Sequence, residues 1–122
     1  MVGSLPPLGW RAKNSSASDL AQFDIYPNPG VKKAEIPFLV AIQNDHITSR
    51  TGACVVIPLR ANAQPVETIA PLVDVPGAGL FVLSSDEIFA IDSSRLRHPV
   101  ATLSAQDRAK IKPALDKVIG EY

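Results

Sequence analysis

The sequence contains a single cysteine, Cys54, and only two histidines among its 122 residues. One cysteine excludes an intramolecular disulfide and cannot complete a thiolate metal site, and His46 and His98 do not have the spacing of zinc ligands. Cys54 lies in the apolar run "ACVVIPL", where we expect a buried structural thiol. The sequence therefore predicts neither a metal nor another cofactor, and the scarcity of cysteine is typical of a reducing cytoplasm.

The chain also lacks an excess of charge and a long hydrophobic run. Lysine and arginine together number 12, as do aspartate and glutamate, so the net charge is zero. Without a basic excess, we expect no direct nucleic-acid partner. No stretch approaches the roughly 18–20 apolar residues that cross a bilayer, and the N-terminus has no signal-peptide core. We expect a cytoplasmic protein without membrane contact.

The length and a hydrophobic content of 46% fit one domain with a modest core. Residues 1–20 mix glycine, adjacent prolines and serines without helical or strand periodicity. We therefore expect a loosely held N-terminal extension or leader at 1–20 and the folded domain at 21–122.

Short apolar runs follow one another from residue 22, each closed by polar residues, glycine or proline. The run "QFDIY" alternates with period two, whereas "IPFLVAIQ" and "CVVIPL" are nearly continuous and predict buried central strands. Short connections then favour an antiparallel meander, with a hairpin turn at "GAG". Pro99 restricts the last strand to an edge or a strand start. The predicted strands are 22–26, 36–43, 54–59, 70–75, 79–84, 87–92 and 98–103.

The closing segment from residue 104 predicts helix. Ser104, with Asp107 three residues later, makes a start that resembles a capping box. Pro113 predicts a kink, or a first turn followed by a new helix that begins near the proline. Gly120 is a plausible C-terminal cap. The apolar positions that share one helical face are Ile111, Leu115, Val118 and Ile119.

No catalytic constellation is apparent from the residues. Ser84 and Ser85 lack the glycine pattern of a nucleophile elbow. The acidic residues are scattered at predicted turns and strand ends, which does not support a paired acid and base. We therefore expect the chain not to be an enzyme. These acidic residues are Asp24, Asp45, Asp74, Asp86, Glu87 and Asp92.

Four stretches in order resemble the CcdB family, the toxins of bacterial toxin–antitoxin pairs. They are "QFDIYPNP" at 22–29, "FLVAIQNDHI" at 38–47, "VVIPL" at 55–59 and "LSAQDRAKI" at 103–111. The resemblance covers residues 21–122 and places the start of the family-like chain near Ala21. It implies a mainly β fold, an SH3-like antiparallel β-barrel with a C-terminal α-helix (CcdB/MazF-like), and a homodimer.

The resemblance also implies an activity. Members of the family bind the A subunit of DNA gyrase, trap its cleaved-DNA complex, and are neutralised by an antitoxin segment that folds on binding. Their poisoning depends on a terminal aromatic–glycine–aliphatic triplet. Here Gly120 matches the glycine, but Ile119 replaces the aromatic residue and Glu121 the aliphatic one, with Tyr122 beyond. Burying the charge of Glu121 in a dry partner pocket would cost several kcal/mol. We predict that these four residues contact the target.

Three further hypotheses remain open. Arg108 and Lys112 on the closing helix are candidates for contact with an acidic antitoxin, against the ordinary role of a solvated helix face. The same barrel type also hosts endoribonuclease toxins, for which Asp45, His46 and Arg50 in one loop are the best catalytic candidates, although the neutral charge argues against RNA. Finally, the altered terminus "IGEY" is compatible with an interaction module that has lost toxicity.

Overall fold

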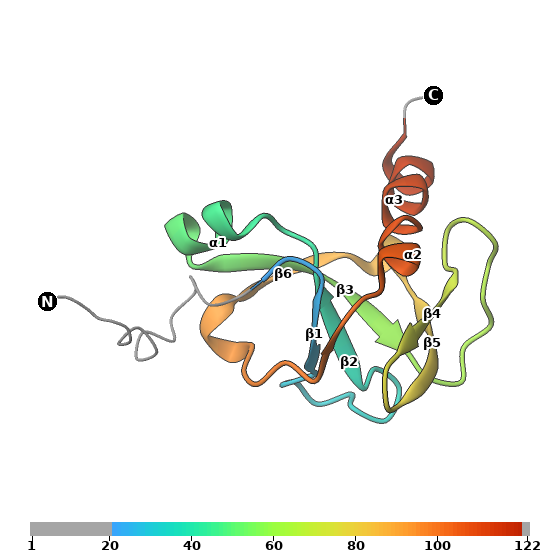
Figure 1. Ribbon diagram of the computed structural model, residues 1–122, viewed down its shortest axis with the longest axis horizontal. Coiled ribbons are helices and arrows are strands. Elements are labelled where there is room, and N and C mark those ends of the chain that lie inside the picture. Colours follow the sequence, from blue (N-terminus) through green and yellow to red (C-terminus); the bar gives the residue numbers. More distant parts are fainter. Residues whose placement is uncertain (1–20, 121–122) are drawn as a thin grey trace, which may run out of the picture.

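The computed structural model describes residues 21–120 (Figure 1). The predicted extension at 1–20 and the last two residues, Glu121 and Tyr122, lie outside the described part. The strands are β1 (Asp24–Pro27), β2 (Phe38–Ala41), β3 (Ala53–Arg60), β4 (Leu72–Val75), β5 (Gly79–Leu83), β6 (Phe89–Asp92) and β7 (Ala101–Thr102). The helices are α1 (Asp45–Thr51), α2 (Ala105–Arg108) and α3 (Ile111–Ile119), with 3₁₀ turns η3 (Ser85–Glu87) and η4 (Ser93–Arg95).

All strand pairings are antiparallel, and the long strand β3 organises them. The order is β4-β5-β3-β2-β1-β7, and β6 also pairs with β3. One side of β3 pairs with β2, while the other side pairs with β6 over 53–56 and with β5 over 59–60. Because β3 pairs with two strands, β5 and β6, on the same side, the sheet curls. The result is a nearly closed β-barrel with a C-terminal helix, which confirms the predicted fold.

Two sequence-based predictions are wrong in detail. The meander does not continue from β5 to β6, because the turn η3 separates them and both pair with β3 instead of with each other. The stretch 44–53 is not simply a loop but contains helix α1. Asn44 caps this helix by accepting from the backbone N–H of His46 (2.8 Å), and Gly52 ends it in the left-handed conformation with φ +76°.

Apolar side chains cover both faces of the central strands. Ile25, Val40 and Ile57 belong to the larger cluster, and their chain neighbours Tyr26, Leu39 and Val56 belong to the second cluster on the opposite face. Because successive side chains of a strand alternate between faces, a strand buried on both sides must be apolar throughout. This explains the continuous runs "IPFLVAIQ" and "CVVIPL" and confirms the prediction of buried central strands.

The closing helical segment is divided into two helices, α2 and α3, as the position of its proline predicts. Ser104 Oγ accepts from the backbone N–H of Asp107 (3.1 Å) at the start of α2, and α3 begins at Ile111. Pro113 is the third residue of α3, where the backbone N–H that it lacks would have no helical partner. The prediction of a first turn followed by a new helix near Pro113 is confirmed. The predicted edge position of the last strand is also confirmed, because within residues 21–120 β7 pairs with β1 alone.

Candidate functional site

Helix α3 rises from one end of the barrel and is the last described element of the chain (Figure 1). Ile111 and Ala114, at its base, are buried, and Leu115 packs against the larger core cluster. At the last position of the helix, however, the side chain of Ile119 is 67% exposed. An isoleucine fixed on an anchored helix, with most of its surface in water, is available to a partner's apolar pocket.

Gly120 follows the helix in a conformation that other residues also adopt, with φ −51°. Glycine is required here for steric reasons, because a Cβ atom at this position would clash with the carbonyl oxygen of Asp116. The prediction of Gly120 as the C-cap is confirmed in position, although the left-handed geometry typical of glycine caps is absent. The roles predicted for Glu121 and Tyr122 fall outside the described residues.

Helix α2 fixes the base of α3 to the sheet. The carboxylate of Asp107 accepts from the backbone N–H of Asp74 (2.8 Å) on edge strand β4, and Lys110 donates to the carbonyl of Leu72 (2.8 Å) on the same strand. Asp107 and Lys110 also form an ion pair at 2.9 Å. Because α2 directly follows β7, these bonds span the gap between the two edge strands of the barrel.

The electrostatics of this connection depend on one carboxylate. Burial opposes the ionisation of Asp107, but the hydrogen bonds from Asp74 and Lys110 outweigh it and hold the pKa of Asp107 below its ordinary value. The side chain of Asp107 is only 9% exposed, so little water competes with these bonds. The charged form of Asp107 therefore stabilises the attachment of α2 at neutral pH.

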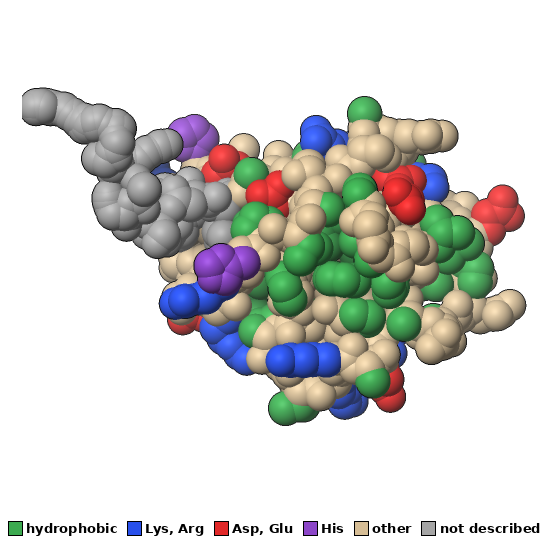
Figure 2. Space-filling model, turned by 60° about the horizontal axis from the view of Figure 1, so that its bottom comes forward, with side chains coloured by type: hydrophobic (Ala, Val, Ile, Leu, Met, Phe, Trp, Pro, Cys, Tyr) green, Lys and Arg blue, Asp and Glu red, His purple; other side chains and the backbone are tan. Residues whose placement is uncertain are grey.

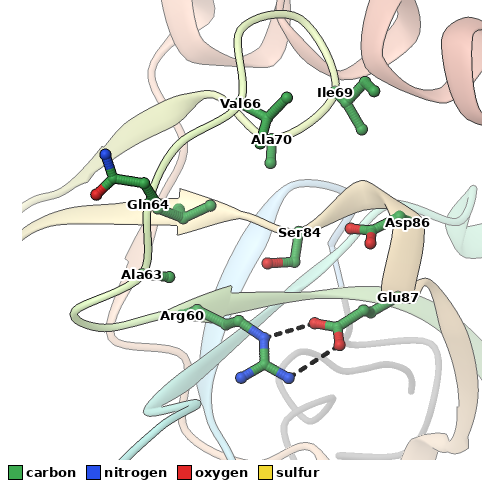
Figure 3. Close-up of a pocket in the computed structure, with 10 residues that line it drawn as sticks. Arg60, Ala63, Gln64, Val66, Ile69, Ala70, Ser84, Asp86 and Glu87 are labelled. Atoms are coloured by element: carbon green, nitrogen blue, oxygen red, sulfur yellow. Dashed lines mark hydrogen bonds and ion pairs between the residues drawn. The ribbon is translucent and has the colours of Figure 1, made fainter.

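A groove of about 330 Å³ lies beside η3, the turn on which α3 packs (Figure 3). Arg60 and Glu87 face each other there in a bidentate ion pair, with Nε to Oε1 at 2.6 Å and Nη2 to Oε2 at 2.9 Å. These bonds raise the pKa of Arg60 and lower that of Glu87. The pair connects the end of β3 to η3 and so helps to position η3, on which α3 packs.

Sequence reasoning missed the role of Arg60, because no pattern links it to a glutamate 27 positions away. Ser84 lies between this pair and the loop that carries Val66 (Figure 3). Ser85 Oγ donates to the carbonyl of Ile69. Among residues 21–120, the groove is lined by the acids Asp86 and Glu87 and by no histidine, and Glu87 is held by Arg60.

The two cations proposed to face an antitoxin differ in their surroundings. The guanidinium of Arg108 lies 5.0 Å from the centroid of the Phe23 ring, and its Nε donates to the carbonyl of Leu103 (3.1 Å). Arg108 is therefore held against the barrel. The side chain of Lys112 is 83% exposed and pairs only with Asp116 (3.1 Å) among the described residues. Lys112 is the more accessible of the two.

The three ribonuclease candidates lie together on α1, and all are exposed. His46 and Arg50 are four residues apart, so they share one face of the helix, with Asp45 in the first turn. None of them lines the groove beside η3. The structure thus brings the three residues onto one short helix at the surface without enclosing them.

The remaining chemistry of the described residues is sparse. Cys54 is buried as predicted, and its desolvation raises the pKa of the thiol. Between residues 21 and 120 no group of three or more His, Cys, Asp or Glu side chains is placed to hold a metal ion. In the same part of the chain, no helix has the length and apolarity needed to span a membrane.

Comparison with known proteins places the chain in a family. Residues 22–120 match the family model described as CcdB protein. No curated protein matches the sequence.

Solved structures share the fold at low sequence identity. An endoribonuclease in complex with its cognate antitoxin, from Mycobacterial species, has a TM-score of 0.69 at 14% identity, over 84% of this chain and 97% of that chain. MazE–MazF from Deinococcus radiodurans has a TM-score of 0.64 at 16% identity, over 83% and 95% of the two chains. The Mycobacterium tuberculosis toxin MazF-mt6 has a TM-score of 0.62 at 14% identity, over 79% and 95%.

These structures correct one prediction. We expected no enzymatic activity because the sequence lacks a familiar catalytic motif. That inference is wrong, because the barrel found here is also the fold of endoribonucleases.

The family match covers residues 22–120, which is nearly the whole of the described domain. The chain belongs to the CcdB family of toxin proteins.

Proposed function

We propose that this protein is a toxin that binds the A subunit of DNA gyrase through the tip of α3 and traps the cleaved-DNA complex. The observation that carries the proposal is the exposed apolar side chain of Ile119 at the end of a projecting helix, followed by the sterically required Gly120. These residues stand where the family resemblance implies the target contact. The proposal places the protein in the cytoplasm, where gyrase acts.

The proposal includes two protein partners besides gyrase. One is an antitoxin, which is supported by the solved complexes of toxins with this fold. The exposed Lys112 is the better of the two cations proposed to meet it. The other partner is a second copy of the chain. Figure 2 shows hydrophobic side chains gathered in the middle of one face, and an apolar surface of this kind is typical of a dimer interface.

Calorimetry with the full chain and the purified gyrase A subunit tests the target. We expect binding that Ile119→Asp weakens roughly 30-fold or more, because a buried aliphatic anchor commonly contributes 2 kcal/mol or more. Leu80→Asp is the matched control, since Leu80 is 64% exposed but lies on β5. Absence of binding by the wild-type chain, or equal weakening by both variants, would contradict the proposal.

A second candidate function is RNA cleavage, and the observation that favours it is the fold shared with endoribonucleases. Arg50 would stabilise charge on the phosphate, and His46 on the same face of α1 would transfer a proton. Incubation of the purified chain with single-stranded RNA tests this. Cleavage that is lost in both Arg50→Ala and His46→Ala, and kept in Lys112→Ala, would support it. Intact RNA, or cleavage unchanged by both substitutions, would refute it.

A further inference from the structure

The charges of this chain cancel overall but not locally. The loop between β1 and β2 carries Lys32 and Lys33, and the segment from η4 to β7 carries Arg95 and Arg97. We call these four residues the basic rim. The two loops meet where the guanidinium of Arg95 donates to the carbonyl of Pro29 at 3.5 Å. Both lie at the end of the barrel opposite α3 (Figure 1).

The four cations are exposed, and within residues 21–120 none of them forms an ion pair. Two nearby acids feel the charge of the rim, because Lys32 helps to lower the pKa of Glu87 and Arg95 helps to lower that of Asp92. Asp92 accepts from the backbone N–H (3.0 Å) and hydroxyl (2.8 Å) of Ser94, and Glu35 lies 4.0 Å from Arg60. Figure 2, which turns this end forward, shows Lys and Arg side chains along the lower left and the lower edge of this face, with Asp or Glu side chains beside some of them. The four cations outnumber the two carboxylates of Glu87 and Asp92, so the basic rim keeps a net positive potential.

We propose that the basic rim binds the phosphate backbone of duplex DNA. Duplex DNA carries one negative charge per about 1.7 Å of helix axis, which is dense enough to attract a small set of exposed cations without any pocket. An acidic peptide carries fewer charges per length and commonly relies on apolar anchors in enclosed pockets. None of the four cations lines the groove beside η3.

The composition of the rim loops favours duplex over single-stranded nucleic acid, because His98 is their one aromatic ring. Residues 28–37 and 93–100 contain no phenylalanine, tyrosine or tryptophan. Proteins that bind single strands commonly stack the bases on such rings, whereas backbone contacts alone are sufficient for a duplex. The expectation of no nucleic-acid partner used the charge of the whole chain. That sum does not reveal how the charges are distributed over the surface.

Fluorescence anisotropy with a labelled DNA duplex, titrated with the full chain between about 50 and 200 mM salt, tests the proposal. Four phosphate contacts predict a slope of log affinity against log salt of about −3.6. The double variant Lys32→Gln/Lys33→Gln should reduce this slope to about −1.8 and weaken binding by roughly tenfold or more per cation at 50 mM salt. The matched control, Lys112→Gln/Lys117→Gln, removes the same charge from α3 and should leave the slope unchanged.

Three outcomes would overturn the proposal. The first is no salt-dependent binding of the duplex by the wild-type chain. The second is an equal loss in the rim and α3 variants, since binding would then depend only on net charge. The third is tighter binding of single-stranded RNA or of poly-glutamate than of the duplex. Because the assay contains no gyrase, its result does not depend on the proposed target, and a failure to bind gyrase would leave it unaffected.

Discussion

Replacing Asp107 by alanine should detach α2 from the edge of the sheet. The backbone N–H of Asp74 loses its acceptor, and Lys110 loses its partner while still facing the carbonyl of Leu72. An unsatisfied, partly buried N–H costs about 1–3 kcal/mol. The ion pair adds about 0–1 kcal/mol, because the Lys110 side chain is 40% exposed and screened by water. We therefore expect Asp107→Ala to lower the free energy of unfolding by roughly 2–3 kcal/mol.

Thermal unfolding followed by circular dichroism measures this loss. For a domain of about 100 residues, it corresponds to a fall in Tm of roughly 10–20 °C. Asp116→Ala is the matched control, because its partner Lys112 is exposed on α3, and we expect a change below about 0.5 kcal/mol. If Asp107→Ala destabilises the protein no more than Asp116→Ala does, the bridge between β4 and α2 does not hold α3 in place.

The pH dependence gives an independent check on the same carboxylate. The pKa of Asp107 is lowered in the folded state, so its contribution is present above the ordinary aspartate pKa of about 3.9 and is lost as pH falls through the folded value. The stability difference between wild type and Asp107→Asn should therefore shrink below about pH 4. A difference that stays constant as the pH falls would show that the charge of Asp107 is not involved.

The remaining predictions concern α3, its support and the core. Gly120→Ala should fray the end of α3, seen as faster amide exchange there, because the added Cβ clashes with Asp116; unchanged exchange would refute this steric argument. Glu87→Gln should cost at most about 1 kcal/mol, since the pair with Arg60 is partly exposed. That difference should vanish as pH falls below the ordinary glutamate pKa, because the pKa of Glu87 is lowered; a urea-unfolding series that shows no such convergence would contradict it. Cys54 should resist iodoacetamide until the protein unfolds, since burial raises the pKa of its thiol; rapid labelling of the native protein would show that the site opens.

Local signals predicted much of the fold. The run around Ile25 indicated a strand, the continuous runs around Ile57 indicated burial on both faces, and Ser104 indicated the start of α2. Each of these depends on neighbours within a few residues. The predicted alternation with Phe23 is wrong, because β1 begins only at Asp24, Phe23 lies before it with φ +75°, and Tyr26 is buried beside Ile25. Sequence reasoning failed for the pairing of β6, because β3 serves two partners on one side and their order is set only when the sheet curls.

In the candidate site, too, some features could be predicted from the sequence and others could not. The resemblance drew attention to Ile119 and Gly120, and the structure adds why the first is accessible and the second sterically required. The contacts of Asp107 with Asp74, and of Arg60 with Glu87, join residues 33 and 27 positions apart. No local pattern predicts such pairs, because they arise from the closure of the barrel.

The central claim is that the tip of α3 carries the target contact, and trapping of gyrase on DNA tests it most directly. Purified full chain, gyrase, supercoiled plasmid and ATP are incubated, and linear DNA is measured. We predict that linear DNA accumulates with wild type and with Leu80→Asp, and that Ile119→Asp abolishes the accumulation. A well-folded wild-type chain that leaves no linear DNA, or an Ile119→Asp variant as active as wild type, would contradict the claim.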